Sequence, residues 1–146
     1  MKILAINPGS TSTKIAVFEG LENVFTKTLR HSVEELAPYH KIIDQYEFRK
    51  NIIISALSEQ GIKVSELGAI VGRGGLLKPI PGGVYKVNDA LLADLRSDRI
   101  SEHASNLGGV LAKAIASEAG SDVPSFIVDP VVVDELQDLA RLSGHP

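Results

Sequence analysis

The fold is decided by the stretch KILAINPGSTSTKIAVFEGLENVFTKTL, residues 2–29. Residues 2–6 are a short apolar run, residues 13–18 alternate between polar and apolar side chains, and residues 23–29 form a third strand-like segment. Turn-forming residues at positions 7–12 separate the first two segments. This spacing is typical of strands joined by hairpins, so it predicts an antiparallel meander of three strands.

The rest of the chain alternates between helix and strand signals. A capping box that starts at Ser32 and an apolar repeat over residues 39–60 predict a long amphipathic helix. Residues 67–72 predict a buried strand, residues 103–119 a second helix and residues 125–129 a last strand. Together with the meander, these elements predict an α/β fold with a five-stranded mixed sheet of order 3-2-1-4-5 and flanking helices.

The composition is that of an ordinary globular domain of 146 residues, with 44% hydrophobic residues, 23% charged residues and a net charge of −3. The chain has no cysteine, which excludes a disulfide framework, a zinc–thiolate site and a cysteine nucleophile. The mildly acidic balance argues against nucleic-acid binding. The N-terminal apolar run is too short for a signal sequence or a membrane span. We therefore expect a cytoplasmic protein without nucleic-acid or membrane partners.

The segment between the first two predicted strands concentrates groups that bind anions, namely Asn7, Gly9, Ser10, Ser12 and Lys14. A positive φ at Gly9 would expose successive backbone N–H groups, the hydroxyls would donate further hydrogen bonds, and Lys14 adds a positive charge. A solvated turn rich in serine and threonine explains the same residues. Neither the Walker phosphate loop nor the GxGxxG fingerprint occurs in the chain.

Three further candidates stand at the ends of predicted elements. Arg73 lies among glycines after a strand and suits bidentate capture of a carboxylate or phosphate. His103 lies at the start of a helix, where anions are favoured, and Asp129 ends a strand at the edge typical of α/β active sites. Taken alone, a surface arginine, a capping histidine and a turn-forming aspartate explain these residues equally well.

Four motifs together resemble those of butyrate kinases. They are NPGSTSTK (residues 7–14), GRGGLLKPIPGGVY (72–85), HASNLGG (103–109) and IVDPVVVDE (127–135), in the order and near the spacing of that family. The resemblance covers essentially the whole chain. It implies a ribonuclease-H-like domain of the actin-like ATPase superfamily, to which acetate kinases also belong. It also implies reversible ATP-dependent phosphorylation of butyrate to butyryl phosphate, with ATP and magnesium as cofactors.

The resemblance also implies roles for individual residues. The hairpin residues match positions that handle nucleotide phosphates: Asn7, Gly9, Ser10, Ser12 and Lys14. The other three match the substrate arginine, the phosphoryl histidine and the metal-site aspartate, which reaches magnesium through water: Arg73, His103 and Asp129. Members of the family are more than twice as long. The resemblance therefore implies that residues 1–146 are the N-terminal domain of a two-domain acyl kinase. This domain is expected to be inactive alone. His145 matches no functional position of the family and is assigned no role.

The chemistry of a carboxylate acceptor agrees with this interpretation. A carboxylate is already ionised at about pH 7 and needs no general base, but it needs its charge neutralised before it approaches phosphate. Kinases of acetate, propionate or branched short-chain acids are alternatives within the class. A non-catalytic actin-like ATPase module and an interaction protein with flexible glycine loops are alternatives from other classes. The oligomeric state stays open, a homo-oligomer of the full-length protein included.

Overall fold

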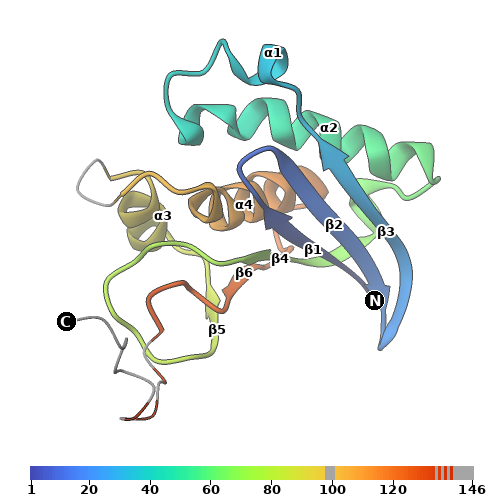
Figure 1. Cartoon of the computed structure of the whole chain (residues 1–146). Helices are drawn as coiled ribbons and strands as arrows, with labels where there is room; N and C mark the ends of the chain where they lie inside the picture. Colours follow the sequence, from blue (N-terminus) through green and yellow to red (C-terminus); the bar gives the residue numbers. More distant parts are fainter. Residues whose placement is uncertain (98–100, 134, 136, 138, 140–146) are drawn as a thin grey trace.

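A mixed β-sheet forms the centre of the protein (Figure 1). The computed structural model describes residues 1–97, 101–133, 135, 137 and 139, and within them the strand order is β3-β2-β1-β4-β6-β5. The strands are β1 (Lys2–Pro8), β2 (Ser12–Glu19), β3 (Glu22–Arg30), β4 (Leu67–Arg73), β5 (Val84–Lys86) and β6 (Ser125–Val128). The helices are α1 (Val33–Leu36), α2 (Tyr46–Glu59), α3 (Asp89–Leu95) and α4 (Leu107–Ala119), with the 3-10 turns η1 (Ile42–Gln45), η2 (Val64–Glu66) and η3 (Ala104–Asn106).

The first three strands form the predicted meander. β1 pairs with β2, and β2 pairs with β3, both antiparallel. Polar and apolar residues alternate along β2 because one face packs on the core, so that Ile15 is fully buried whereas Lys14 is exposed. The prediction that residues 23–29 lie beside residues 13–18 is confirmed.

The second half of the sheet contains one strand more than predicted. β4 lies parallel to β1 and to β6, so the predicted order is confirmed for the five predicted strands, of which β6 is the fifth. The prediction of a five-stranded sheet is wrong, because β5 adds an edge strand antiparallel to β6, with Tyr85 opposite Ile127. β5 is three residues long and follows Pro81 and two glycines. Its pairing with β6, and not its local sequence, makes it a strand.

The helices begin and end at different residues from those predicted. The segment 39–60 contains η1 followed by α2, and a φ of 71° at the following Gly61 marks the helix stop. The capping box at Ser32 is confirmed, but it opens the separate four-residue helix α1. The helix predicted for residues 103–119 begins only at Leu107, after η3. Helix α3 has no counterpart among the predicted elements.

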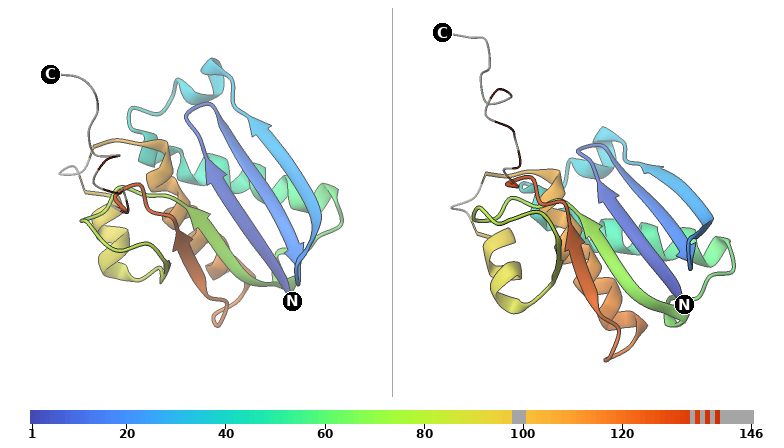
Figure 2. Two further views of the ribbon diagram at one scale, coloured as in Figure 1. Left: turned by 60° about the horizontal axis from the view of Figure 1, so that its bottom comes forward. Right: turned by 90° about the horizontal axis from the view of Figure 1, so that it is seen from below.

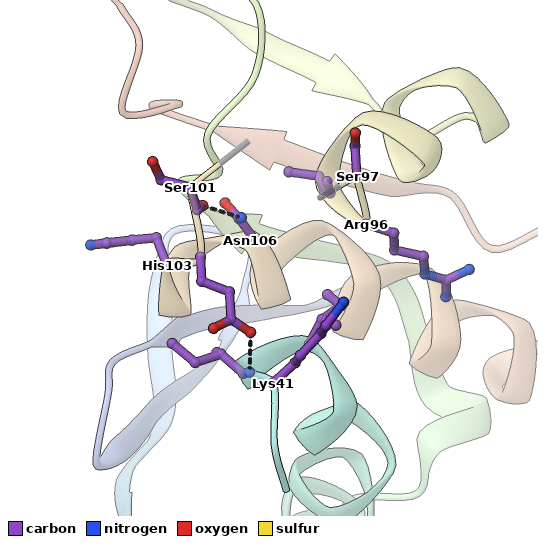
Figure 3. Close-up of a pocket in the computed structure, with 10 residues that line it drawn as sticks. Lys41, Arg96, Ser97, Ser101, His103 and Asn106 are labelled. Atoms are coloured by element: carbon purple, nitrogen blue, oxygen red, sulfur yellow. Dashed lines mark hydrogen bonds between the residues drawn. The ribbon is translucent and has the colours of Figure 1, made fainter. Parts of the chain in front are cut away.

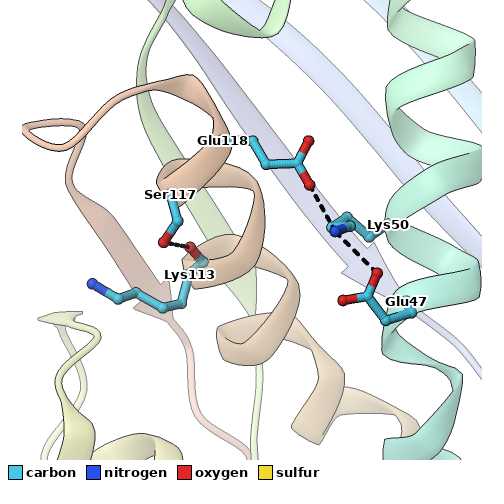
Figure 4. Close-up of polar contacts among 5 residues, drawn as sticks. All are labelled: Glu47, Lys50, Lys113, Ser117 and Glu118. Carbon is cyan, nitrogen blue, oxygen red and sulfur yellow. Dashed lines mark hydrogen bonds and ion pairs between the residues drawn. The ribbon is translucent and has the colours of Figure 1, made fainter.

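Helices α2 and α4 pack against each other on one face of the sheet, as Figure 2 shows. Lys50 of α2 links them, because its Nζ lies 3.0 Å from Glu47 of the same helix and 2.6 Å from Glu118 of α4 (Figure 4). No described helix is long and apolar enough to cross a membrane. The core between helices and sheet includes the buried side chains of Leu4, Ile15, Ile53, Ile70, Leu107, Leu111 and Ile115.

Helix α4 begins in direct contact with the end of β4. A Cβ atom on Gly72 would lie 2.1 Å from the carbonyl oxygen of Gly108. A Cβ atom on Gly108 would lie 2.6 Å from the carbonyl oxygen of Arg73. These two glycines therefore let the backbones of strand and helix touch, which brings the start of α4 close to the strand ends.

His31, directly after β3, is buried with 5% exposure. Its Nε2 lies 2.9 Å from Thr13 Oγ1, and its Nδ1 has no hydrogen-bond partner among the described residues. Burial lowers the pKa of His31 below its ordinary value of 6.5, the charge of Arg49 lowers it further, and Glu35 opposes the shift. As the pH falls, the unfolded chain therefore takes up a proton at this position before the folded protein does.

We expect the protein to lose stability as the pH falls through about 6.5. The contribution of His31 to stability is complete above that pH and is lost below it. The reason is that the histidine of the unfolded state has the higher pKa, so below about pH 6.5 the unfolded state binds more protons than the folded state. Between about pH 7.5 and about pH 5.5, the thermal midpoint should fall more in the wild type than in His31→Gln, whose amide does not titrate. His40→Gln, at an exposed histidine, is the control and should behave like the wild type. Equal pH dependence in the wild type and His31→Gln would contradict the prediction.

Candidate active site

Three strands place a row of polar side chains on the sheet face opposite the buried core. Lys14 of β2 is paired with Asn7 of β1. Asn7 is level with Arg73 of β4, because the preceding residues Ile6 and Gly72 are partners. Neighbouring strands are about 4.8 Å apart. The side chains of Lys14, Asn7 and Arg73 are therefore neighbours across the sheet.

A cleft of about 460 Å³ opens beside this row. Its lining includes Asn7, Arg73, His103 and Asp129, so the structure brings four of the predicted site residues together. A volume between about 300 and 1,000 Å³ is typical of small-molecule sites. An adjoining cavity of about 310 Å³ shares three of these residues and adds Lys14. The remaining predicted residues line neither cavity: Gly9, Ser10 and Ser12.

Arg73 is presented to the cleft by a loop that two backbone hydrogen bonds hold. The N–H of Gly74 donates to the carbonyl of Val128 (2.9 Å), and that of Val131 donates to the carbonyl of Gly75 (3.1 Å). The φ angles of the two glycines are 85° and 118°, values that few other residues adopt. The Arg73 guanidinium is exposed and has no hydrogen bond or ion pair with another described residue. It is therefore available to an anion.

His103 caps the turn η3, and Ser105 orients its ring. The backbone N–H of Ser105 donates to Nδ1 (3.2 Å), and the Ser105 hydroxyl oxygen lies 2.6 Å from the same nitrogen. Because a backbone N–H can only donate, Nδ1 is an acceptor and the neutral ring carries its hydrogen on Nε2. The group that His103 offers to a ligand is thus the Nε2–H donor.

Asp129, directly after β6, has a φ of 50° and is the one described residue other than glycine with a positive φ. Backbone strain of this kind costs about 1 to 3 kcal/mol and is concentrated at functional sites. Among the described residues, no three histidine, aspartate or glutamate side chains gather into a metal-binding group. Magnesium at phosphoryl-transfer sites takes one or two carboxylates together with substrate phosphates. The exposed Asp129 carboxylate fits that pattern as a single protein ligand, either directly or through water.

The tip of the β1–β2 hairpin, residues 9–12 and called the hairpin tip below, differs from the prediction. Gly9 is not among the glycines with positive φ, so the hairpin does not use the left-handed conformation that glycine allows there. A Cβ atom there would approach Ser12 no closer than 3.4 Å, which is an ordinary contact. The tip is held from inside by Arg49 of α2. The guanidinium donates to three carbonyl oxygens of the tip, those of Gly9 (2.7 Å), Ser10 (2.8 Å) and Ser12 (3.1 Å).

Arg49 is a residue that the sequence analysis missed. Its side chain is fully buried, and burial lowers its pKa to about 10, so it remains charged near neutral pH. The apolar repeat of the predicted helix contained a signal, because position 49 falls on the same helical face as Tyr46 and Ile53. An arginine in the middle of an apolar face indicates a cation that the fold must satisfy with buried acceptors.

A second polar cavity, of about 400 Å³, also borders His103 (Figure 3). Glu102 joins its two sides by accepting a hydrogen bond from the N–H of Ile42 (2.7 Å). Asn106 donates to the carbonyl of Ser101 (3.3 Å) in the same region (Figure 3). Of the predicted site residues, His103 is the one that lines this cavity. Glu102 and Asn106 therefore hold neighbouring segments together beside His103.

Solved structures with the same fold include kinases of short-chain acids. The protein superposes on acetate kinase from Entamoeba histolytica (TM-score 0.57, 14% identity, covering 90% of this chain and 37% of that one). It also superposes on propionate kinase from Francisella tularensis (TM-score 0.54, 13% identity, 90% and 37%). T. thermophilus RuvC in complex with a Holliday junction shares the fold as well (TM-score 0.50, 13% identity, 90% and 66%). These similarities show the α/β fold of acetate kinase with its mixed sheet, and the fold alone.

Sequence comparison is more specific. No family model matches the chain. The chain is 56% identical over 145 residues to the probable butyrate kinases of Clostridium botulinum strains Eklund 17B (type B) and Alaska E43 (type E3). The alignment covers 99% of this chain and 40% of each relative. Over nearly its whole length the chain is therefore similar to probable butyrate kinases, and the resemblance identified from its motifs is confirmed.

Proposed function

We propose that this chain forms part of a butyrate kinase, which transfers the γ-phosphoryl group of ATP to butyrate in a reversible reaction. The observation that carries the proposal is the cleft where Asn7, Arg73, His103 and Asp129 meet, in a chain 56% identical to probable butyrate kinases. The chain spans 40% of the length of those relatives, so the activity is proposed for the whole protein.

The reaction makes one main electrostatic demand. A carboxylate oxygen attacks the γ-phosphorus, the bond between that phosphorus and the ADP oxygen breaks, and no proton has to move. Two unit negative charges at about 4 Å repel by about 4 kcal/mol at an effective dielectric constant of about 20. Groups that offset this repulsion and align the reactants supply most of the catalysis in phosphoryl transfer.

The residues of the cleft suit this demand. Arg73 holds the butyrate carboxylate through its two parallel N–H donors, since its guanidinium has no described partner. His103 donates its Nε2–H to the transferring phosphoryl group, in the tautomer that Ser105 selects. Asp129 would hold magnesium through water, and magnesium bound there would neutralise phosphate charge. The nucleotide phosphates contact the hairpin residues Asn7, Gly9, Ser10, Ser12 and Lys14.

Discrimination among short-chain acids is expected to be modest. Each buried methylene contributes about 0.8 kcal/mol, so the two additional methylenes of butyrate favour it over acetate by roughly fifteenfold. Acetate, propionate and branched acids are therefore the alternative substrates to test beside butyrate. The charged end of the acid is the same in all of them, so anchoring by Arg73 should be required for each.

A chimera tests the proposal, with this chain replacing the matching segment of a Clostridium botulinum relative. With MgATP and butyrate, the chimera should form ADP and butyryl phosphate in equal amounts. ADP formed without acyl phosphate would favour an actin-like ATPase module instead. No nucleotide turnover by a folded chimera would favour an interaction protein.

The Lys14→Ala variant of the chimera tests the hairpin. We expect kcat/KM for ATP to fall at least about tenfold, because a charge-assisted hydrogen bond contributes about 1.5 to 3 kcal/mol. Lys63→Ala, at an exposed lysine outside both cavities that line the site, is the matched control. An unchanged kcat/KM for ATP in Lys14→Ala would contradict the phosphate role and favour the alternative, in which the hairpin is a solvated turn.

Three expectations stay predictions: the domain assignment of residues 1–146, the cytoplasmic location and the inactivity of the isolated chain. The isolated chain is expected to lack activity because a kinase site must exclude water around the nucleotide. Butyrate-dependent ADP formation by the purified 146-residue chain would contradict this expectation. His145 lies outside the described residues.

A further inference from the structure

The hairpin tip owes its shape to the buried side chain of Arg49. Besides its three hydrogen bonds to tip carbonyls, the guanidinium donates to Thr13 Oγ1 (3.0 Å). Gln45 Oε1 accepts from both Nη2 (2.8 Å) and Nε (3.1 Å) and so aims the guanidinium at the tip. All N–H groups of this fully buried arginine therefore donate hydrogen bonds, either to the hairpin tip or to Thr13 and Gln45.

These contacts determine which way the amides of the tip point. No described peptide bond is cis, and in a trans peptide the C=O and N–H groups point in opposite directions. Because the carbonyls of Gly9 and Ser10 face Arg49, the following N–H groups of Ser10 and Thr11 face away from it. Neither N–H has an acceptor among the described residues. Two successive amides with this shared direction are a favourable arrangement for an anion.

The charge behind the tip is not compensated within the described residues. Every acceptor of Arg49 is neutral, being a backbone carbonyl, a threonine hydroxyl or a glutamine amide. A buried cation is costly to keep without a counter-charge. An anion bound to the outward amides would provide that counter-charge across a single layer of backbone.

We propose that Arg49 is the positioning residue of the phosphate-binding hairpin: it turns the amides of Ser10 and Thr11 outward and supplies positive potential behind them. The inference rests on the proposed function and deepens it, because it names what makes this hairpin bind phosphate. Gly9 does not adopt the positive φ that could have exposed these amides, and Arg49 from the distant helix α2 orients them instead. A purely structural role would make Arg49 matter for stability but not for anion affinity.

Inorganic pyrophosphate is the probe, titrated into the 146-residue chain while its backbone amide NMR signals are followed. In the wild type, the signals of Ser10 and Thr11 should shift with saturation. Absence of any shift at these amides would overturn both the phosphate role of the hairpin and this inference. Shifts in the wild type establish the phosphate role, and the variants then test Arg49.

Gln45→Glu is the decisive variant. A carboxylate keeps both hydrogen bonds to Arg49 but neutralises its charge, so the thermal midpoint should stay equal or rise while pyrophosphate affinity falls at least about threefold. A structural role alone cannot lower affinity while stability is kept. Gln60→Glu introduces the same change at an exposed position at the other end of α2 and should keep wild-type affinity.

Arg49→Lys tests the geometry, because a lysine keeps the charge but lacks the planar fork that reaches three carbonyls. Affinity should fall at least about tenfold, with the ligand-induced shifts at Ser10 and Thr11 lost first. If Arg49→Lys does not fold, Gln45→Glu still decides. If the wild type binds pyrophosphate and Gln45→Glu binds it equally tightly, the inference is overturned, whereas the proposed function is not affected.

Discussion

Gly72→Ala is expected to destabilise the protein by at least about 3 kcal/mol. The new Cβ would lie 2.1 Å from the carbonyl oxygen of Gly108, so the backbone of β4 or of α4 must move. A shift there also displaces Arg73, the next residue of the strand. For a domain of this size, the thermal midpoint should fall by roughly 10 °C, measurable by calorimetry. A loss below about 1 kcal/mol would show that strand and helix are not in the close contact described.

Gly68→Ala is the matched control in the same strand. Its Cβ would lie 2.4 Å from Cγ and 2.9 Å from Sδ of Met1, a flexible residue that is 75% exposed. Moving Met1 costs little, and alanine is no worse than glycine in a strand, so the change should stay within about 0.5 kcal/mol. The contrast between the two variants isolates the close approach of β4 to α4 from any general effect of alanine in β4.

Arg73→Lys in the chimera is expected to lower kcat/KM for butyrate at least about a hundredfold while affecting ATP much less. Lysine keeps the charge but loses two parallel hydrogen bonds to the carboxylate, together worth about 3 kcal/mol. A short-chain acid has one charged group, its carboxylate, so little else in the molecule can orient it. Steady-state kinetics with each substrate varied in turn measures the two values.

Three further variants sharpen this result. Arg30→Lys, at the end of β3 and exposed, is the control for the chemical change and should leave the kinetics unaltered. Asp129→Asn should change the magnesium requirement more than the KM for butyrate. If Arg73→Ala cripples use of ATP but leaves butyrate kinetics intact, Arg73 serves phosphate, and the acyl site must lie elsewhere.

Strong local patterns made much of the fold predictable. The meander of residues 2–29 was predictable because its turns and its polar and apolar alternation are local signals. β5 and α3 were missed because they are short, and β5 depends on its pairing with β6. The predicted helix over residues 39–60 was too long because its apolar repeat continues through η1. An apolar face alone does not distinguish a 3-10 turn from an α-helix.

The residues of the candidate site were predictable as separate motifs, but their meeting in one cleft was not. Residue types and turn chemistry pointed to Asn7, Arg73, His103 and Asp129 one motif at a time. Strand register then brought them to one cleft, because β1 and β4 lie side by side although more than fifty residues separate them. Arg49 shows most clearly what the sequence could not predict. Its signal in the sequence was a charge on an apolar helix face, which does not indicate the groups that accept its hydrogen bonds.

By itself, the sequence determined the longer elements and the chemical groups that they carry, because hydrophobic periodicity, capping and turn residues act over a few neighbouring positions. The tertiary structure alone decided which groups meet. Hydrogen-bond register across distant strands aligned Lys14, Asn7 and Arg73, and the contact of Gly72 with Gly108 set the start of α4 against the sheet. Burial made the Arg49 guanidinium bond the nearest carbonyls, those of the hairpin tip, because a charge removed from water must find acceptors where it stands.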